Sequence, residues 1–223
     1  MKKILLSLLL CLALTPVLYG QSYNWADALP RATHIVSAQL GWEYAAIAGL
    51  SYGYRLPTCR PLVFQAGISA PFGQSALDDF TLQAGLRGVA WERHHLKAIL
   101  ALGGSYQHYA SELVRIGTLG AELQAELGIY RPRWFVAGET GLHLGLAARL
   151  RHSEIYTQTI YATARDGWYG PVSGGFVHGG IQTGYSFKRS DLVFRIGYLQ
   201  SVTSGTNALI PYYTTLGYNW RIQ

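Results

Sequence analysis

The chain has 223 residues, enough for one domain, and its 18 Lys and Arg against 12 Asp and Glu give a formal charge of +6. Charged residues make up only 13% of the sequence, yet it holds 16 Tyr and 6 Trp, a composition suited to a surface that meets lipid and both membrane interfaces. The basic residues are scattered over predicted turns instead of concentrated on one element, which argues against nucleic-acid binding.

The N-terminus has the pattern of a secretory signal peptide. Its first three residues form a short positive segment, and an almost unbroken apolar run extends from 4 to 17. The run is too short for a membrane-spanning helix, so we predict a signal peptide over residues 1–20. Residues 21–33 are then a periplasmic N-terminal segment. Cleavage lowers the formal charge to +4 and leaves Cys59 as the only cysteine, which excludes an intramolecular disulfide.

Ten segments alternate apolar and polar side chains with a period of two, as strands with one lipid-facing and one polar face must. The length of each segment is close to that of a tilted membrane strand, which needs about 9 to 11 residues. After the signal peptide, no stretch approaches the roughly 18 apolar residues of a membrane helix, so a chain that spans a bilayer must do so as a closed barrel. The segments are 35–42, 46–55, 62–69, 80–87, 96–106, 119–130, 134–146, 176–187, 192–199 and 213–223.

Segment 119–130 is also compatible with a helix on propensity. Leu119, Leu123 and Leu127 recur every four residues, as on one face of a helix. The glutamates and the glutamine between the apolar positions nevertheless complete a strict period of two, and glycines interrupt the segment. Because its neighbours alternate in the same way, we predict a strand.

The connections between the segments alternate in length, as the short turns and long loops of a transmembrane barrel do. Both termini then fall on the periplasmic side. The connection at 43–45 is shorter than this pattern requires, so eight strands are the alternative to about ten. The short links are 56–61, 91–95, 131–133 and 188–191, and the longer ones are 70–79, 107–115, 148–174 and 200–211.

The last strand carries a recognisable pattern: a polar residue, a glycine two residues on, and aromatic or apolar residues three and five after the glycine. These are Thr215, Gly217, Trp220 and Ile222. In this pattern and in its strands, the chain over 34–223 resembles the small bacterial outer-membrane β-barrel family, porin-like and adhesin-like barrels of about eight to ten strands. The resemblance implies an all-β, antiparallel up-and-down transmembrane β-barrel, with the four residues as its signal for the barrel-insertion machinery. The chain ends in Gln223, where many members end in phenylalanine.

If the apolar residues face lipid, the polar positions of the strands line the lumen, and both charge signs occur among them. A barrel of about ten strands has a plugged or very narrow lumen, because about eight strands leave an interior that side chains just fill. An unpaired ion there is unfavourable, so we predict a network in which the basic residues neutralise the acidic ones. Its charged members are Arg87, Lys97, Arg195, Arg221, Glu122, Glu126 and Glu139; Gln65, Gln83, Gln124, His143, His178 and Gln182 complete the predicted lumen.

A hydrolase is the sharper alternative, with His143 or His178 as the general base and Glu139 as its orienting carboxylate. Glu139 and His143 would share one face of a strand, since they are four residues apart. No serine in a recognisable nucleophile setting accompanies them, so we favour a non-enzymatic role. His94 and His95 are adjacent and cannot readily share a metal ion on a strand, and we expect neither a metal nor a cofactor.

The longest connection, 148–174, is rich in arginine and aromatic residues, the types that anchor binding surfaces. We therefore expect a candidate external binding site there for an unidentified protein partner. The alternative is a loop that folds over the barrel mouth or lies among lipopolysaccharide headgroups. The residues concerned are Arg149, Arg151, His152, Arg165, Trp168 and Tyr169, together with Tyr156 and Tyr161.

Together these patterns predict an integral outer-membrane barrel with a structural, binding or weakly permeating, porin-like role. Its expected partners are outer-membrane lipid and lipopolysaccharide, and nucleic acid is not among them. One alternative is a lipid A-modifying hydrolase or a protease with its site in the barrel mouth, and another is a subunit of a larger envelope assembly. A soluble β-sandwich is the rival fold, and the aromatic residues on outward faces at strand ends argue against it.

Overall fold

The computed structural model describes residues 22–26, 33–42, 45–72, 78–159, 164–170, 175–202 and 211–222. The predicted signal peptide lies outside these ranges. No helix within them is long and apolar enough to cross a membrane. The elements are β1 (His34–Trp42), β2 (Ala46–Leu56), β3 (Leu62–Pro71), β4 (Asp79–Arg93), β5 (Leu96–Ala110), β6 (Val114–Arg131), β7 (Trp134–His152), α2 (Glu154–Thr159), β8 (Gly167–Tyr169), β9 (Gly175–Ser186), β10 (Ser190–Ser201) and β11 (Tyr212–Ile222).

Ten of the strands form one closed antiparallel barrel. Neighbours along the chain pair with each other, β7 pairs with β9, and the pairing of β1 with β11 closes the ring. The short β8 is not part of the ring, because it pairs only with β7 beyond the end of β9. The predicted up-and-down barrel of about ten strands is confirmed, and the eight-stranded alternative is wrong. Segment 119–130 lies within strand β6, as the period of two predicted.

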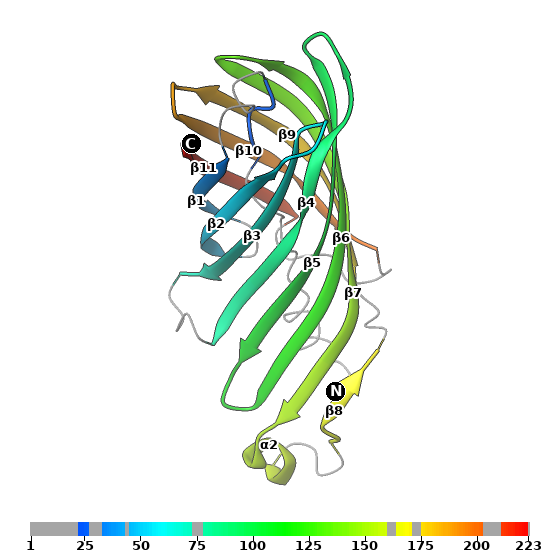
Figure 1. Cartoon of the computed structure of the whole chain (residues 1–223). Helices are drawn as coiled ribbons and strands as arrows, with labels where there is room; N and C mark the ends of the chain where they lie inside the picture. The colour runs from blue at the N-terminus through cyan, green and yellow to red at the C-terminus, as the bar shows by residue number, and fades with distance from the viewer. Residues whose placement is uncertain are drawn as a thin grey trace.

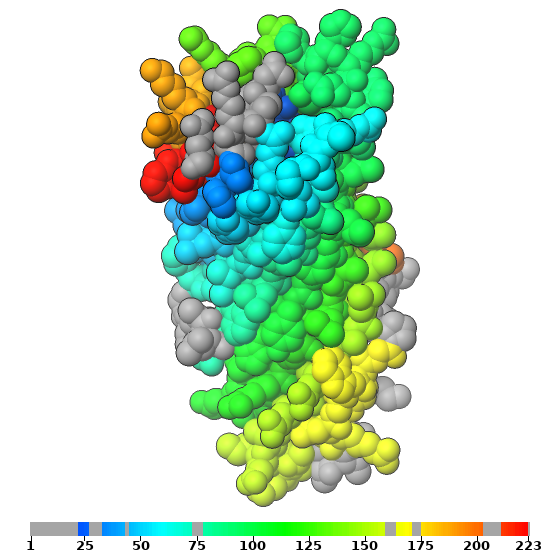
Figure 2. Space-filling model, viewed as in Figure 1, coloured from blue at the N-terminus to red at the C-terminus, as the bar shows by residue number. Residues whose placement is uncertain are grey.

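The wall formed by β4, β5, β6 and β7 is taller than the rest of the barrel. These strands have 15, 15, 18 and 19 residues, whereas β1 has 9 and β11 has 11. Figure 1 shows them continuing past the other strands at the end that carries α2 and β8, and Figure 2 shows the same green and yellow part of the molecule reaching furthest down. We call this the loop end, and we call the opposite end, where β1 begins and β11 finishes, the terminal end.

The height of this wall corrects the predicted long connection at 107–115. Strand β5 continues to Ala110 and β6 begins at Val114, so only residues 111–113 connect them. The alternation of buried and exposed side chains continues into this extension, because Val114 and Ile116 pack against Tyr109 and Leu150 on the inner face of the wall. Part of the predicted loop 148–174 is likewise strand, since β7 extends to residue 152.

The outer surface of the barrel is apolar. Every barrel strand exposes large aliphatic side chains, whereas many polar and charged side chains are buried inside, the distribution expected of a barrel that stands in lipid. Exposed aromatic residues mark both ends of this band. The aliphatic positions include Leu40, Leu50, Ile68, Leu82, Leu102, Leu123, Leu146, Ile181, Ile196 and Leu216, and the aromatic ones include Trp42, Phe72, Tyr198 and Tyr212 at the loop end and Trp91, Trp134, Tyr185 and Trp220 at the terminal end.

An apolar core fills the barrel interior at the terminal end. Three of its members, Tyr23, Trp25 and Ala26, come from residues 22–26, which precede β1, and the two aromatic side chains are each only 1% exposed. Figure 1 shows this dark blue segment among the strands at the terminal end. Residues 21–33 are the predicted periplasmic segment, and its residues 22–26 lie within the barrel. The wall contributes Ile35, Val63, Val89, Ile99, Tyr130, Phe135, Ala137 and Val193 to this core.

Candidate functional sites

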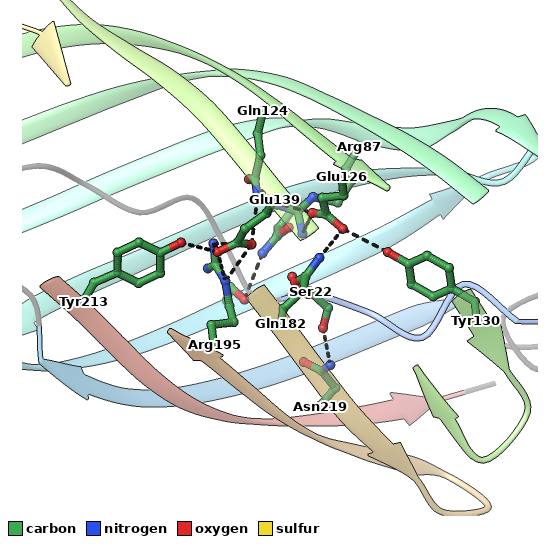
Figure 3. Close-up of polar contacts among 12 residues, drawn as sticks. Ser22, Arg87, Gln124, Glu126, Tyr130, Glu139, Gln182, Arg195, Tyr213 and Asn219 are labelled. Atoms are coloured by element: carbon green, nitrogen blue, oxygen red, sulfur yellow. Dashed lines mark hydrogen bonds and ion pairs between the residues drawn. The ribbon is translucent and has the colours of Figure 1, made fainter. Parts of the chain in front are cut away.

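Two buried ion pairs lie next to each other in the lumen. Arg87 Nη1 on β4 is 3.3 Å from Glu126 Oε1 on β6. Arg195 Nη2 on β10 is 3.0 Å from Glu139 Oε2 on β7. Gln124 joins the pairs, because its side-chain oxygen accepts a hydrogen bond from Arg87 (2.7 Å) and its nitrogen donates to both carboxylates (3.3 Å each). Figure 3 shows how these residues converge from different walls of the barrel.

Both carboxylates accept further hydrogen bonds. Glu126 Oε2 accepts from the Gln182 amide on β9 (2.6 Å) and from the Tyr130 hydroxyl (3.3 Å). Glu139 Oε1 accepts from the Tyr213 hydroxyl on β11 (2.5 Å). Each buried carboxylate therefore has a guanidinium and neutral donors, the combination that makes a buried charge tolerable. The network connects β4, β6, β7, β9, β10 and β11, so it braces the barrel from within.

Two basic residues of the predicted network lie elsewhere. Lys97 Nζ is 2.8 Å from Glu92 Oε1, across the β4–β5 hairpin. Arg221 is 3.1 Å from Asp191 Oδ1 and also donates to the Phe187 carbonyl (2.8 Å). Both belong to the terminal end, several positions along their strands from the central carboxylates. The alternation of a sequence gives the face of a side chain but not its height in the barrel, which is why these pairings were mispredicted.

A serine and a histidine meet in the lumen nearer the loop end. Ser105 Oγ on β5 lies 3.1 Å from His143 Nε2 on β7, and both side chains are buried. The strand between them leaves room for this contact because it has Gly120 there, where a Cβ atom would lie 2.6 Å from the His143 nitrogen. Glu122 lies directly opposite His143 in the β6–β7 register. Ser105 was missed in the sequence, where nothing marks it as the neighbour of a histidine.

The predicted relay between Glu139 and His143 is not formed. The hydrogen bonds of Glu139 go to Arg195, Tyr213 and Gln124. His178 also faces the lumen, with its ring edge-on to Tyr213 at 6.2 Å between centroids. Two further predicted lumen residues, Gln65 and Gln83, are buried there as well.

Hydrogen bonds fix residues 22–26 inside the barrel. Asn24 Nδ2 donates to the Arg131 carbonyl (2.8 Å) and to Ser186 Oγ (2.7 Å). Asn219 Nδ2 on β11 donates to the Ser22 carbonyl (2.8 Å), a contact that Figure 3 includes. About eight strands fill their own interior with side chains, so a ten-stranded ring has space for an additional segment. Residues 22–26 occupy that space at the terminal end.

The predicted insertion signal lies on β11, the strand that closes the ring with β1. Thr215 and Gly217 face the interior, whereas Trp220 and Ile222 face outward and are exposed. The aromatic and apolar members of the pattern thus belong to the lipid-facing surface, next to the terminal end.

A β-bulge changes which residues of β7 face outward. Leu119 on β6 pairs with Ala147, but the next residue, Gly120, pairs with Gly145, so Leu146 is an extra residue. On the side of the bulge toward the terminal end, the odd-numbered residues of β7 are buried. On the side toward the loop end, Arg149 and Arg151 are exposed although they are also odd-numbered. Bulges re-aim side chains in this way.

The remaining residues of the predicted external site gather around β8. The main-chain N–H of His152 donates to Asp166 Oδ1 (2.8 Å) and the His152 ring lies 2.9 Å from the same oxygen, contacts that hold the pKa of Asp166 below its usual range. The Tyr169 hydroxyl donates to the Arg165 carbonyl (2.6 Å). Trp168 pairs with Arg149 across β7 and β8. In addition, Tyr156 of α2 stacks on His152, whereas Tyr161 lies outside the described residues.

Within the described ranges, no group of three or more His, Cys, Asp and Glu side chains could hold a metal ion. His94 and His95 form the turn between β4 and β5, where His94 adopts a φ of 57°. Cys59 is exposed in the turn that follows β2.

Neither a protein-family model nor a curated protein sequence matches the chain. Among solved structures, it is similar to the KdgM porin (6% identity, TM-score 0.42, 85% of this chain and 99% of that one). It is also similar to the NanC porin (8% identity, TM-score 0.44, 84% and 100%). A third likeness is to the β domain of the Bordetella autotransporter Brka (14% identity, TM-score 0.37, 85% and 98%). At these identities and scores the likeness assigns no activity to this chain.

Proposed function

We propose that the chain is an integral outer-membrane barrel that is closed at its periplasmic end and acts by binding at its outer surface, not as a general diffusion pore. The apolar band with aromatic residues at both ends supports the membrane location. Barrels of this kind have short periplasmic turns, and the terminal end carries the two-residue turns at 94–95 and 132–133. The terminal end is therefore assigned to the periplasm, and the tall wall with β8 to the cell exterior.

The observation that carries the closure is the burial of Tyr23 and Trp25 inside the ring. Both are 1% exposed, among inward side chains from opposite walls. Next to this core, Gln124 links two ion pairs across the interior. A solute that crossed the lumen would have to displace both the apolar core and this network, and the network contains paired charges that are unfavourable to separate.

Conductance of purified protein in planar bilayers tests the closure. We expect the full mature chain to show no stable open channel. A measurable channel is expected from a variant that lacks residues 22–26 and in which Arg87, Glu126, Glu139 and Arg195 are all replaced by alanine, because the core segment and the network are then both removed. The matched control is a variant with residues 22–26 kept and the exposed external Trp168 replaced by alanine. A large, steady conductance of the full chain would overturn the proposal. A shift in gel mobility on boiling tests whether the barrel is closed. Separation of the inner from the outer membrane before that measurement tests its location.

A hydrolase is a second candidate, favoured by the contact between Ser105 and His143. A histidine nitrogen at 3.1 Å from a serine hydroxyl can accept its proton and so activate the oxygen as a nucleophile. The test is mass spectrometry of lipid A and phospholipids after incubation with the purified protein. Deacylation that is lost in both Ser105→Ala and His143→Gln, but kept in the lumen control Ser37→Ala, would support this candidate. Unchanged lipids with the intact chain would dismiss it.

A further inference from the structure

The outward face of the tall wall carries a compact basic surface. Its members are Arg115 on β6 and Arg149 and Arg151 on β7, with Trp168 of β8 beside them; we call these four residues the arginine surface. All three arginines are exposed, and Trp168 is 59% exposed. In the part of the chain that the structure describes, none of the three arginines forms an ion pair.

The register places this surface directly above the lipid-facing band. Tyr106, Leu119 and Ala147 stand side by side on β5, β6 and β7. One outward position further toward the loop end, Arg149 stands between Gly117 and Trp168. One position further still, Arg115 faces Arg151. Outward positions on a strand are about 6 to 7 Å apart, so the arginines lie within the headgroup layer that begins where the aliphatic band ends.

The most unusual feature of the arginine surface is the direct pairing of Arg115 with Arg151. Their Cα atoms are direct partners in the ladder, which brings the Cβ atoms of such a pair to about 4.5–5.5 Å. Like charges directly opposite each other are destabilising. Arg149 adds a third guanidinium on the neighbouring outward position, across from Gly117, which has no side chain of its own. An anion held between the guanidinium groups would remove the repulsion, and phosphate suits them because arginine binds it in a bidentate manner.

Acidic residues near this surface do not neutralise it. Asp166 accepts hydrogen bonds from His152, and Arg151 lies near enough to contribute to its lowered pKa without forming an ion pair. Glu112 belongs to the β5–β6 turn and Glu154 to the start of α2, beyond the paired part of both strands.

The bulge at Leu146 produces this arrangement. Without the extra residue, the alternation of β7 would direct Arg149 and Arg151 into the barrel, where Leu150 now packs. A bulge interrupts the ladder and is retained where it re-aims a side chain. Here it brings two arginines to the same outer face as Arg115.

We propose that the arginine surface binds the phosphorylated headgroup of an outer-leaflet lipid, namely lipopolysaccharide, with a phosphate between Arg115, Arg149 and Arg151. The Trp168 ring lies at the sugar level, as interfacial tryptophans do, and the acyl chains lie along the aliphatic band below Leu119. This inference rests on the proposed outer-membrane location.

The test is native mass spectrometry of the full mature chain in detergent, titrated with bisphosphorylated lipid A and with the same lipid after removal of its phosphates. We expect the intact protein to prefer the phosphorylated lipid. Arg115→Gln combined with Arg151→Gln should weaken that binding by about tenfold or more and leave the dephosphorylated lipid unaffected. The matched control is Arg133→Gln, which removes an exposed arginine at the terminal end.

Equal binding of both lipids, or equal loss in the Arg133→Gln control, would overturn the arginine surface as a phosphate site. A gel mobility shift on boiling, measured on each variant, verifies that the barrel is intact. A chain that lacks this shift or fractionates away from the outer membrane would instead overturn the proposed function. The two failures are therefore distinguishable.

Discussion

At the terminal end the barrel is filled, whereas at the loop end four strands extend beyond the rest of the barrel and two of them direct arginines outward. The filled end combines apolar side chains of the wall with Tyr23 and Trp25 from a segment that is not a strand. The extended end keeps its regular pairing, with one bulge, but has few inward contacts. The difference indicates that stability is concentrated at the terminal end, and the binding that we propose lies at the loop end. Substitutions at the two ends can test this division.

Replacing Trp25 by alanine should have the largest effect. The side chain is buried within the terminal core, and losing a buried tryptophan typically lowers the free energy of unfolding by about 3–5 kcal/mol. Urea unfolding of the protein in phospholipid vesicles, followed by gel mobility, measures this change. A loss below about 1 kcal/mol would contradict the filled end as the stable part of the barrel.

Replacing Tyr213 by phenylalanine should have an intermediate effect. The substitution removes the hydroxyl that donates to Glu139, a hydrogen bond to a charged group, for which about 1.5–3 kcal/mol is expected. The same unfolding measurement applies. Tyr212→Phe is the matched control, because the neighbouring ring faces outward and is exposed, and its loss of a hydroxyl should change stability little. Equal effects of both substitutions would show that the network does not brace the barrel.

Replacing Trp168 by alanine should barely change the free energy of unfolding, by less than about 0.5 kcal/mol, because the ring is exposed and belongs to a strand outside the closed ring. It should nevertheless weaken lipid A binding in the titration described above. A large loss of stability in this variant would mean that β8 supports the barrel itself.

The smallest expected effect is a change with pH in the protease sensitivity of the chain around β8, at the loop end. The hydrogen bond from the His152 N–H lowers the pKa of Asp166 when the chain is folded, so this contact stabilises β8 above the ordinary carboxyl pKa and is lost as pH falls through the lowered value. Limited proteolysis at pH 7 and in the acid range should show cleavage near residues 164–170 only in acid. Asp166→Asn should make cleavage there independent of pH. An identical acid response in this variant would contradict the role of Asp166.

The sequence predicted the barrel well because alternation is a local property. Strand β6 was recognised even though its leucines also fit a helix. The extended parts of β6 and β7 were mistaken for loop, because glycine and arginine occupy their outward positions and a bulge interrupts the alternation. Side-chain pairing was harder still: Arg87 and Glu126 are far apart in sequence, and only the register of several strands brings them together.

The site at the terminal end could not be predicted for a different reason. Residues 22–26 form no strand, so nothing in their pattern distinguishes a segment inside the barrel from one outside it. The inward position of Tyr130 and Tyr213, in contrast, follows from the alternation of the strand faces. Each lies an even number of residues from a polar side chain of the same strand that faces inward, Glu126 or Thr215. The alternation should therefore be applied to aromatic residues as well as charged ones when a lumen is predicted.

The single extra residue in β7 has an evolutionary consequence. Because the faces of a strand alternate, deleting one residue near Leu146 would carry Arg149 and Arg151 to the inside, whereas inserting or deleting two would leave them outside. Homologous chains that keep the arginines should thus differ in length at this position only by even numbers. Chains that differ there by one residue should have exchanged the arginines for side chains suited to the interior.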